Sequence, residues 1–122
     1  MSDIYVVTIG SPETTDYDHI CQHLDALLVN AKDNKVTICV PRMGGAAEPL
    51  FLLYSTEREY ELLSEEYKPE YVHEIFDKIR LLSSTGDNSS MIGYVGFGTG
   101  ELVQAIYQYA LTHNIKARKI ND

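Results

Sequence analysis

Three turns rich in small residues each follow an apolar, strand-like run and precede a helical pattern. Gly10-Ser11-Pro12 follows segment 4–9, Gly44-Gly45 follows segment 36–40, and Gly96-Phe97-Gly98-Thr99-Gly100 follows segment 91–95. A strand, a small-residue turn and a helix bring backbone N–H groups and a helix N-terminus up to an anion, most often a phosphate. The repeated arrangement predicts a nucleotide-type site, and it does not identify a reaction.

Several residues of these turns are candidates for contact with the ligand. Thr99 can cap the last predicted helix and also offer its hydroxyl and amide to a phosphate. Arg42 can pair with a phosphate or carboxylate, or with a surface acid of this chain. Glycines at these places can also do no more than shape tight turns, but three such turns at one sheet edge favour binding. The candidate ligand-binding residues are Gly10, Ser11, Arg42, Gly44, Gly45, Gly96, Gly98, Thr99 and Gly100.

Glu101, directly after the third turn, is the candidate catalytic residue. Its carboxylate can accept ribose hydroxyls or act as a general base, or it can be a first-turn acid that the helix dipole stabilises. Glu48, after the second turn, has the same two interpretations. His19 and His23 lie four residues apart but lack a third ligand in sequence, so we expect no metal site and no cofactor.

The bulk composition is that of one folded domain spanning residues 1–122. Acids outnumber bases by 18 to 10, which gives a net charge of −8. Such a charge disfavours non-specific nucleic-acid binding, which depends on Lys and Arg meeting phosphates. Cys21 and Cys39 are isolated in sequence and are expected to be free thiols in a reducing compartment. Without a leader pattern or a long apolar run, we expect a cytoplasmic protein that contacts no membrane.

Strand and helix patterns alternate along the chain, which predicts an α/β fold. We expect one Rossmann-like domain with a mostly parallel sheet of four or five strands and helices on both faces. Segment 56–68, rich in Glu and Tyr, is compatible with a continued helix, an irregular excursion or a short strand. Tyr54, Tyr94 and Phe97 are candidates for stacking on a base. The expected strands are 4–9, 35–40, 91–95 and 116–120, and the expected helices are 17–30 (capped by Thr14, Thr15 or Asp16), 46–54, one that starts at Pro69, and 101–113.

These motifs resemble those of the SLOG superfamily, in particular its YspA- and YpsA-related members, which are similar to lonely-guy nucleotide hydrolases and to the DprA core. The resemblance rests on Ile9-Gly10-Ser11 with Thr15-Asp16-Tyr17, on Met43-Gly44-Gly45-Ala46-Ala47-Glu48, and on Gly98-Thr99-Gly100 with the helix and strand that follow. It covers nearly the whole chain and implies a Rossmann-like fold that binds nucleotides. The lonely-guy acid comes three residues after the threonine, whereas Glu101 comes two after Thr99, a rotation of roughly 100° on a helix.

We therefore expect a protein that binds a nucleotide or a nucleotide-derived small molecule as a sensor, carrier or sequestering protein. One alternative is an enzyme that cuts the N-glycosidic bond of a nucleoside monophosphate, with Glu101 or Glu48 as the acid and Arg42 or Arg80 holding phosphate. Another is a protein-interaction module whose turns are vestigial and which binds through the acidic segment 57–67. Because a neighbouring copy can complete such a pocket, we expect a homo-oligomer.

Overall fold

A computed structural model describes residues 3–31, 34–83 and 90–121, and within these ranges it forms five strands and four α-helices. All strand pairings are parallel, and the strand order is β3-β2-β1-β4-β5. The predicted Rossmann-like α/β fold is thereby confirmed. In chain order the elements are β1 (Asp3–Gly10), α1 (Tyr17–Leu27), β2 (Lys35–Arg42), α2 (Glu48–Glu57), β3 (Glu61–Glu66), a 3₁₀ turn (Pro69–Tyr71), α3 (Glu74–Ser83), β4 (Ser90–Phe97), α4 (Glu101–Thr112) and β5 (Lys116–Ile120).

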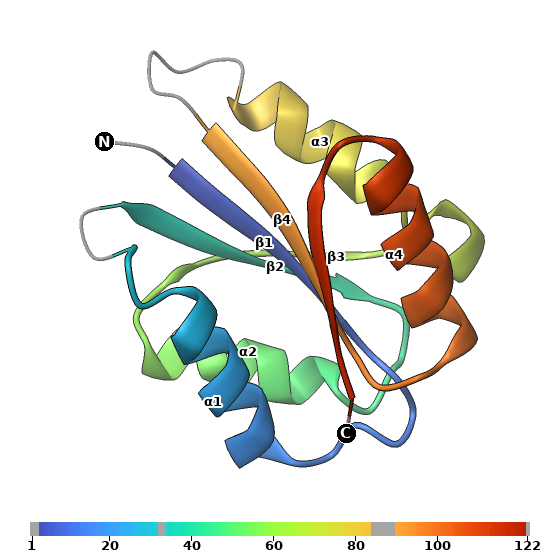
Figure 1. Cartoon of the computed structure of the whole chain (residues 1–122), viewed down its shortest axis with the longest axis horizontal. Helices are drawn as coiled ribbons and strands as arrows, with labels where there is room; N and C mark the ends of the chain where they lie inside the picture. The colour runs from blue at the N-terminus through green and yellow to red at the C-terminus, as the bar shows by residue number, and fades with distance from the viewer. Residues whose placement is uncertain (1–2, 32–33, 84–89, 122) are drawn as a thin grey trace.

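The sheet is covered by helices on both faces, with α1 and α2 on one face and α3 and α4 on the other (Figure 1). Successive residues of a strand point to opposite faces, so the central strand β1 contributes to two separate cores. Val6 packs in the core beneath α1 and α2, whereas Val7 and Ile9 pack beneath α3 and α4. This two-sided burial explains why β1 is almost uniformly apolar rather than alternating.

Local sequence signals set most of the helix boundaries. The Asp16 carboxylate accepts a hydrogen bond from the His19 amide at 3.1 Å, so Asp16 is the N-cap of α1. Pro49 lies in the first turn of α2, as expected, because a proline there removes no helical hydrogen bond. The helix predicted to start at Pro69 begins later. Pro69 opens only a 3₁₀ turn, and α3 starts at Glu74.

Segment 56–68 contains strand β3, one of the three alternatives that its sequence allowed. Residues 84–89 of the predicted polar loop 83–90, and Asp33 of the predicted turn Asp33-Asn34, lie outside the described residues. None of the helices within the described ranges combines the length and the apolar character that crossing a bilayer requires.

The strand order reverses between β1 and β4. From β1 the chain adds β2 and then β3 on one side of the sheet, and it then returns to place β4 and β5 on the other side. In an open parallel sheet, ligands bind outside the carboxyl ends of the strands at such a reversal point. The residues that follow β1 and β4 are those of the first and third predicted turns.

Candidate functional site at the carboxyl edge of the sheet

The turns after β1 and β4 are joined by direct hydrogen bonds. The Ser11 amide donates to the Phe97 carbonyl at 2.8 Å, and the Ser11 hydroxyl accepts from the Gly100 amide at 2.6 Å. The Thr14 hydroxyl also donates to the Phe97 carbonyl, at 3.2 Å. Ser11 and Thr14 are each only 1% exposed. The first and third turns therefore form one rigid unit at the reversal point.

The second turn packs against the first through Gly10. A methyl group added to Gly10 would lie 2.5 Å from the Ala47 Cβ atom and 3.3 Å from the Thr14 Cβ atom. Ala47 is the N-cap residue of α2 and is 2% exposed. Only a glycine lets the start of α2 approach the end of β1 this closely. All three predicted turns are thus gathered around Gly10 and Ser11.

The chain's own carboxylates reach the amide donors of the second and third turns. Glu48 turns back and accepts from the Met43 and Gly45 amides, each at 2.8 Å. Glu13 accepts from the Thr99 amide and from the Thr99 hydroxyl, each at 3.4 Å. The two Glu48 contacts have good length, whereas the two Glu13 contacts are at the long limit of a hydrogen bond. Glu13 is not among the residues predicted from the sequence, because only the folded loop brings it to Thr99.

Gly44, Gly96, Gly98 and Gly100 have reasons within the fold. Gly44 and Gly98 adopt φ values of +83° and +88°, a region that favours glycine. A Cβ atom on Gly100 would lie 2.9 Å from the Ser11 hydroxyl, and one on Gly96 would lie 2.7 Å from a Val103 methyl. Close packing and turn geometry therefore account for these positions with or without a ligand.

Thr99 does not cap the last helix, so that prediction is wrong. The N-cap of α4 is Gly100, and no side chain caps it from that position. Ser11 performs the capping from the neighbouring loop instead. The Thr99 side chain is consequently left exposed at the start of the helix, where Glu13 is its hydrogen-bond partner.

Arg42 lies at the end of β2 beside a cleft of about 490 Å³. Its Nε donates to the Ser64 hydroxyl at 3.0 Å, and its Nη1 lies 3.7 Å from a Glu66 carboxylate oxygen. The same cleft is lined by Gly44, Glu48, Glu66, Tyr67 and Lys68 among others. The half-exposed ring of Tyr67 and the Lys68 ammonium are not among the residues predicted from the sequence, because a strand was only one of three alternatives for the segment that precedes them.

Glu101 is exposed in the first turn of α4, and it makes no hydrogen bond or ion pair to any residue that the structure describes. Arg80, the other residue considered for phosphate, lies near the end of α3. It contacts the Asp77 carboxylate at 3.7 Å and the His113 carbonyl at 3.4 Å. Since α3 and α4 both end at the amino edge of the sheet, Arg80 is on the side opposite the turns and cannot join them.

The aromatic residues predicted to stack on a base are in the core. Tyr54, Tyr94 and Phe97 are at most 1% exposed. The Tyr54 hydroxyl donates to Asp25 at 2.7 Å, and the Tyr94 hydroxyl donates to the Val103 carbonyl at 3.0 Å. Burial is the main cause that raises the pKa of both hydroxyls. These rings are therefore structural, and that prediction is wrong.

Acids of segment 57–67 are partly engaged within the molecule. Glu65 pairs with Lys78, and Glu57 accepts from the Tyr17 hydroxyl.

Cys39 is a buried free thiol, and burial raises its pKa to about 12. Among the described residues, no three His, Cys, Asp or Glu side chains are arranged to hold a metal ion.

Comparison with protein-family models, with curated proteins and with solved structures gave no match for this chain.

Proposed function

We propose that the protein binds a small phosphorylated molecule of the nucleotide class at the carboxyl edge of its sheet. One observation carries the proposal. At the reversal point of the strand order, the Thr99 amide and hydroxyl both face an acid of the same chain, the Glu13 carboxylate, at a long 3.4 Å. A carboxylate in that position has the charge and the acceptor oxygens of a ligand phosphate, and contacts of that length are readily exchanged.

The electrostatics of the start of α4 support the same proposal. The N–H groups of the first turn and the helix dipole place partial positive charge there, which attracts an anion. Ser11 already satisfies the Gly100 amide and fixes the loop, so little ordering is needed when a ligand binds. A phosphate would replace Glu13 and accept from Thr99, and the displaced carboxylate would return to solvent.

The cleft beside β2 supports a ligand larger than phosphate alone. Its two cations, Arg42 and Lys68, offer attraction for a negative group, and Tyr67 offers an aromatic face for a base. Glu48 also lines this cleft and accepts from the Met43 and Gly45 amides. The second turn is therefore better suited to receive polar groups such as ribose hydroxyls than a second phosphate.

The proposal is tested by titrating the protein with a panel of nucleoside monophosphates and the matching nucleosides, using calorimetry. Glu13→Gln removes a competing negative charge, which is worth about 1 kcal/mol at 4 Å in bulk water, so we expect at least roughly fivefold tighter binding of the phosphates. Thr99→Val removes one hydroxyl contact and is expected to weaken binding roughly two- to tenfold. Glu59→Gln, at an exposed acid between α2 and β3 on the opposite edge of the sheet, is the matched control for the change in net charge.

Two results would refute the proposal. One is the absence of saturable binding in both the wild type and Glu13→Gln. The other is an equal response to Glu13→Gln and Glu59→Gln, because that would assign the effect to net charge alone. Native mass spectrometry of the protein purified from cells then identifies any ligand that it retains.

A further inference from the structure

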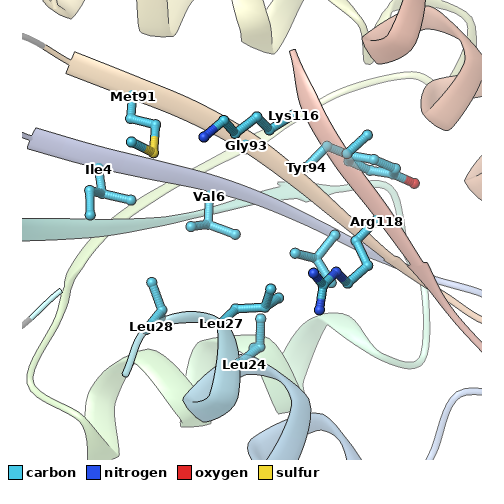
Figure 2. Close-up of a pocket in the computed structure, with 12 residues that line it drawn as sticks. Ile4, Val6, Leu24, Leu27, Leu28, Met91, Gly93, Tyr94, Lys116 and Arg118 are labelled. Carbon is cyan, nitrogen blue, oxygen red and sulfur yellow. The ribbon is translucent and has the colours of Figure 1, made fainter. Parts of the chain in front are cut away.

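A second concave surface lies far from the turns, on the face of the sheet that carries α1 and α2. The core beneath those helices also includes Phe97 and Ile120 at the carboxyl ends of β4 and β5, but the preceding part of these two strands is left beside α1 as a groove of about 300 Å³. Figure 2 shows its lining, with Ile4, Val6, Met91 and Gly93 on the strands and Leu24, Leu27 and Leu28 on α1. Because these strand residues lie in the amino-terminal halves of β1 and β4, the groove is separate from the candidate site above.

Gly93 is the feature of this groove that the fold does not explain. Its φ is not positive, and a Cβ atom added there would meet only the Lys116 carbonyl oxygen, at an ordinary 3.7 Å. Glycine in the middle of a strand weakens it and often marks a site where another molecule approaches closely. Gly10 in the neighbouring strand β1 and Gly96 further along β4 are instead required by close contacts. The missing side chain at Gly93 leaves open space on the groove floor.

Two cations of β5 border the groove. In Figure 2 the Lys116 side chain extends over Gly93 toward Met91, and the Arg118 side chain extends toward α1. Within the described ranges, neither makes a hydrogen bond or an ion pair, although the chain has a net charge of −8. Arg118 also lies close enough to His23 to lower the pKa of that imidazole, after the larger effect of burial. The groove therefore combines an apolar floor with a positively charged border.

We propose that this groove binds a small amphipathic anion, namely a free carboxylate carrying a short unbranched apolar chain. The chain lies over Gly93 between Met91 and Leu27, and the carboxylate pairs with Lys116 and Arg118. A planar guanidinium matches the two oxygens of a carboxylate. A volume of about 300 Å³ is at the lower end for small-molecule sites, which limits the chain to roughly eight carbons.

Octanoate is the probe, and 1-octanol is the uncharged comparison. We expect saturable octanoate binding by calorimetry, with shifts of groove resonances in ¹⁵N–¹H spectra. Lys116→Gln with Arg118→Gln is expected to weaken octanoate binding roughly tenfold or more and to leave octanol binding unchanged. Lys119→Gln is the matched control. Lys119 is on the same strand but faces α4, where it donates to Gln104 at 2.7 Å and lies over the Tyr107 ring.

Gly93→Val fills the groove from its floor, and its Cβ atom would have its nearest contact at an ordinary 3.7 Å, with the Lys116 carbonyl oxygen. We expect it to abolish binding of octanoate and octanol while urea unfolding shows stability equal to or above that of the wild type. Binding that survives in this variant, or that is insensitive to loss of both cations, would overturn the proposal. The wild type could also prove to be a dimer that Gly93→Val dissociates but octanoate leaves intact. That result would assign the groove to a second copy of the chain and would also overturn the proposal.

Discussion

Gly10→Ala tests whether the three turns are held together by the contact between β1 and α2. Carbon atoms pack best at about 3.5–4.0 Å, and the new methyl group would lie 2.5 Å from the Ala47 Cβ atom. Both atoms are attached directly to backbone, so neither can rotate away. The start of α2 must therefore move by roughly 1 Å, and overpacking of this kind costs about 1–3 kcal/mol.

The backbone at Gly10 does not complicate the test, because its φ is not positive and alanine can adopt it. Gly93→Ala makes the same chemical change on β4, where the nearest atom is 3.7 Å away. There we expect a neutral effect or a gain of about 0.4–1 kcal/mol from the stiffer unfolded chain. The comparison separates the steric effect from the loss of chain entropy.

Urea unfolding followed by circular dichroism measures both variants. A loss of 1–3 kcal/mol corresponds to a fall in melting temperature of about 4 °C for each kcal/mol in a chain of this length. Adding Ala47→Gly to Gly10→Ala removes the opposing methyl group and is expected to restore most of the loss. Equal stabilities of Gly10→Ala and Gly93→Ala, or strict additivity in the double variant, would refute the reasoning.

Two further predictions concern pH. The hydrogen bond from Arg58, aided by one from Tyr54, holds the pKa of Asp25 below its ordinary value of 3.8. The stability that this lowered pKa contributes is complete above about pH 4 and is lost as pH falls through the folded pKa. The urea midpoint of Asp25→Asn should therefore depend less on pH between about pH 5 and pH 2 than that of the wild type. An unchanged dependence would contradict this. Burial, with smaller effects of His19 and Arg118, lowers the pKa of His23 below 6.5. Protonation of His23 is therefore less favourable in the folded state, so the free energy of unfolding falls as pH drops below about 6.5. In His23→Gln the urea midpoint should differ less between about pH 7.5 and pH 5.5 than it does in the wild type. A difference as large as that of the wild type would rule out His23 as the source.

The alternation of elements was predictable because strands buried on both faces and helices with one apolar face leave strong periodic signals. Strand β3 was not predictable in the same way, because an edge strand that carries Glu61, Glu65 and Glu66 lacks the apolar run of a central strand. The helix expected at Pro69 failed for a related reason. Proline is compatible with the first turn of either helix type, so its presence does not decide between a 3₁₀ turn and an α-helix.

The candidate site was predictable only in outline. Turns that follow parallel strands must gather at one sheet edge, and the structure places Gly10, Gly45 and Gly98 there. The partners of the amides could not be read from the sequence, because Glu13 and Thr99 are joined only after folding, 86 residues apart. Burial of Tyr94 and Phe97 was likewise hidden, because an aromatic residue near a strand end has the same local sequence whether it faces the core or a ligand.

The order of the strands has a consequence for how the chain folds. β1 pairs with β4 in the centre of the sheet, and the bond between Gly100 and Ser11 closes a loop of 89 residues. Closing a loop of that length costs about 4 kcal/mol of chain entropy by ideal-chain scaling. During synthesis, β1 can pair with β2 as soon as β2 has emerged, but its other edge waits until nearly the whole chain has been made. The reversal point therefore assembles after the β1–β2–β3 side of the sheet, and a chain interrupted within β4 has the first turn without the third.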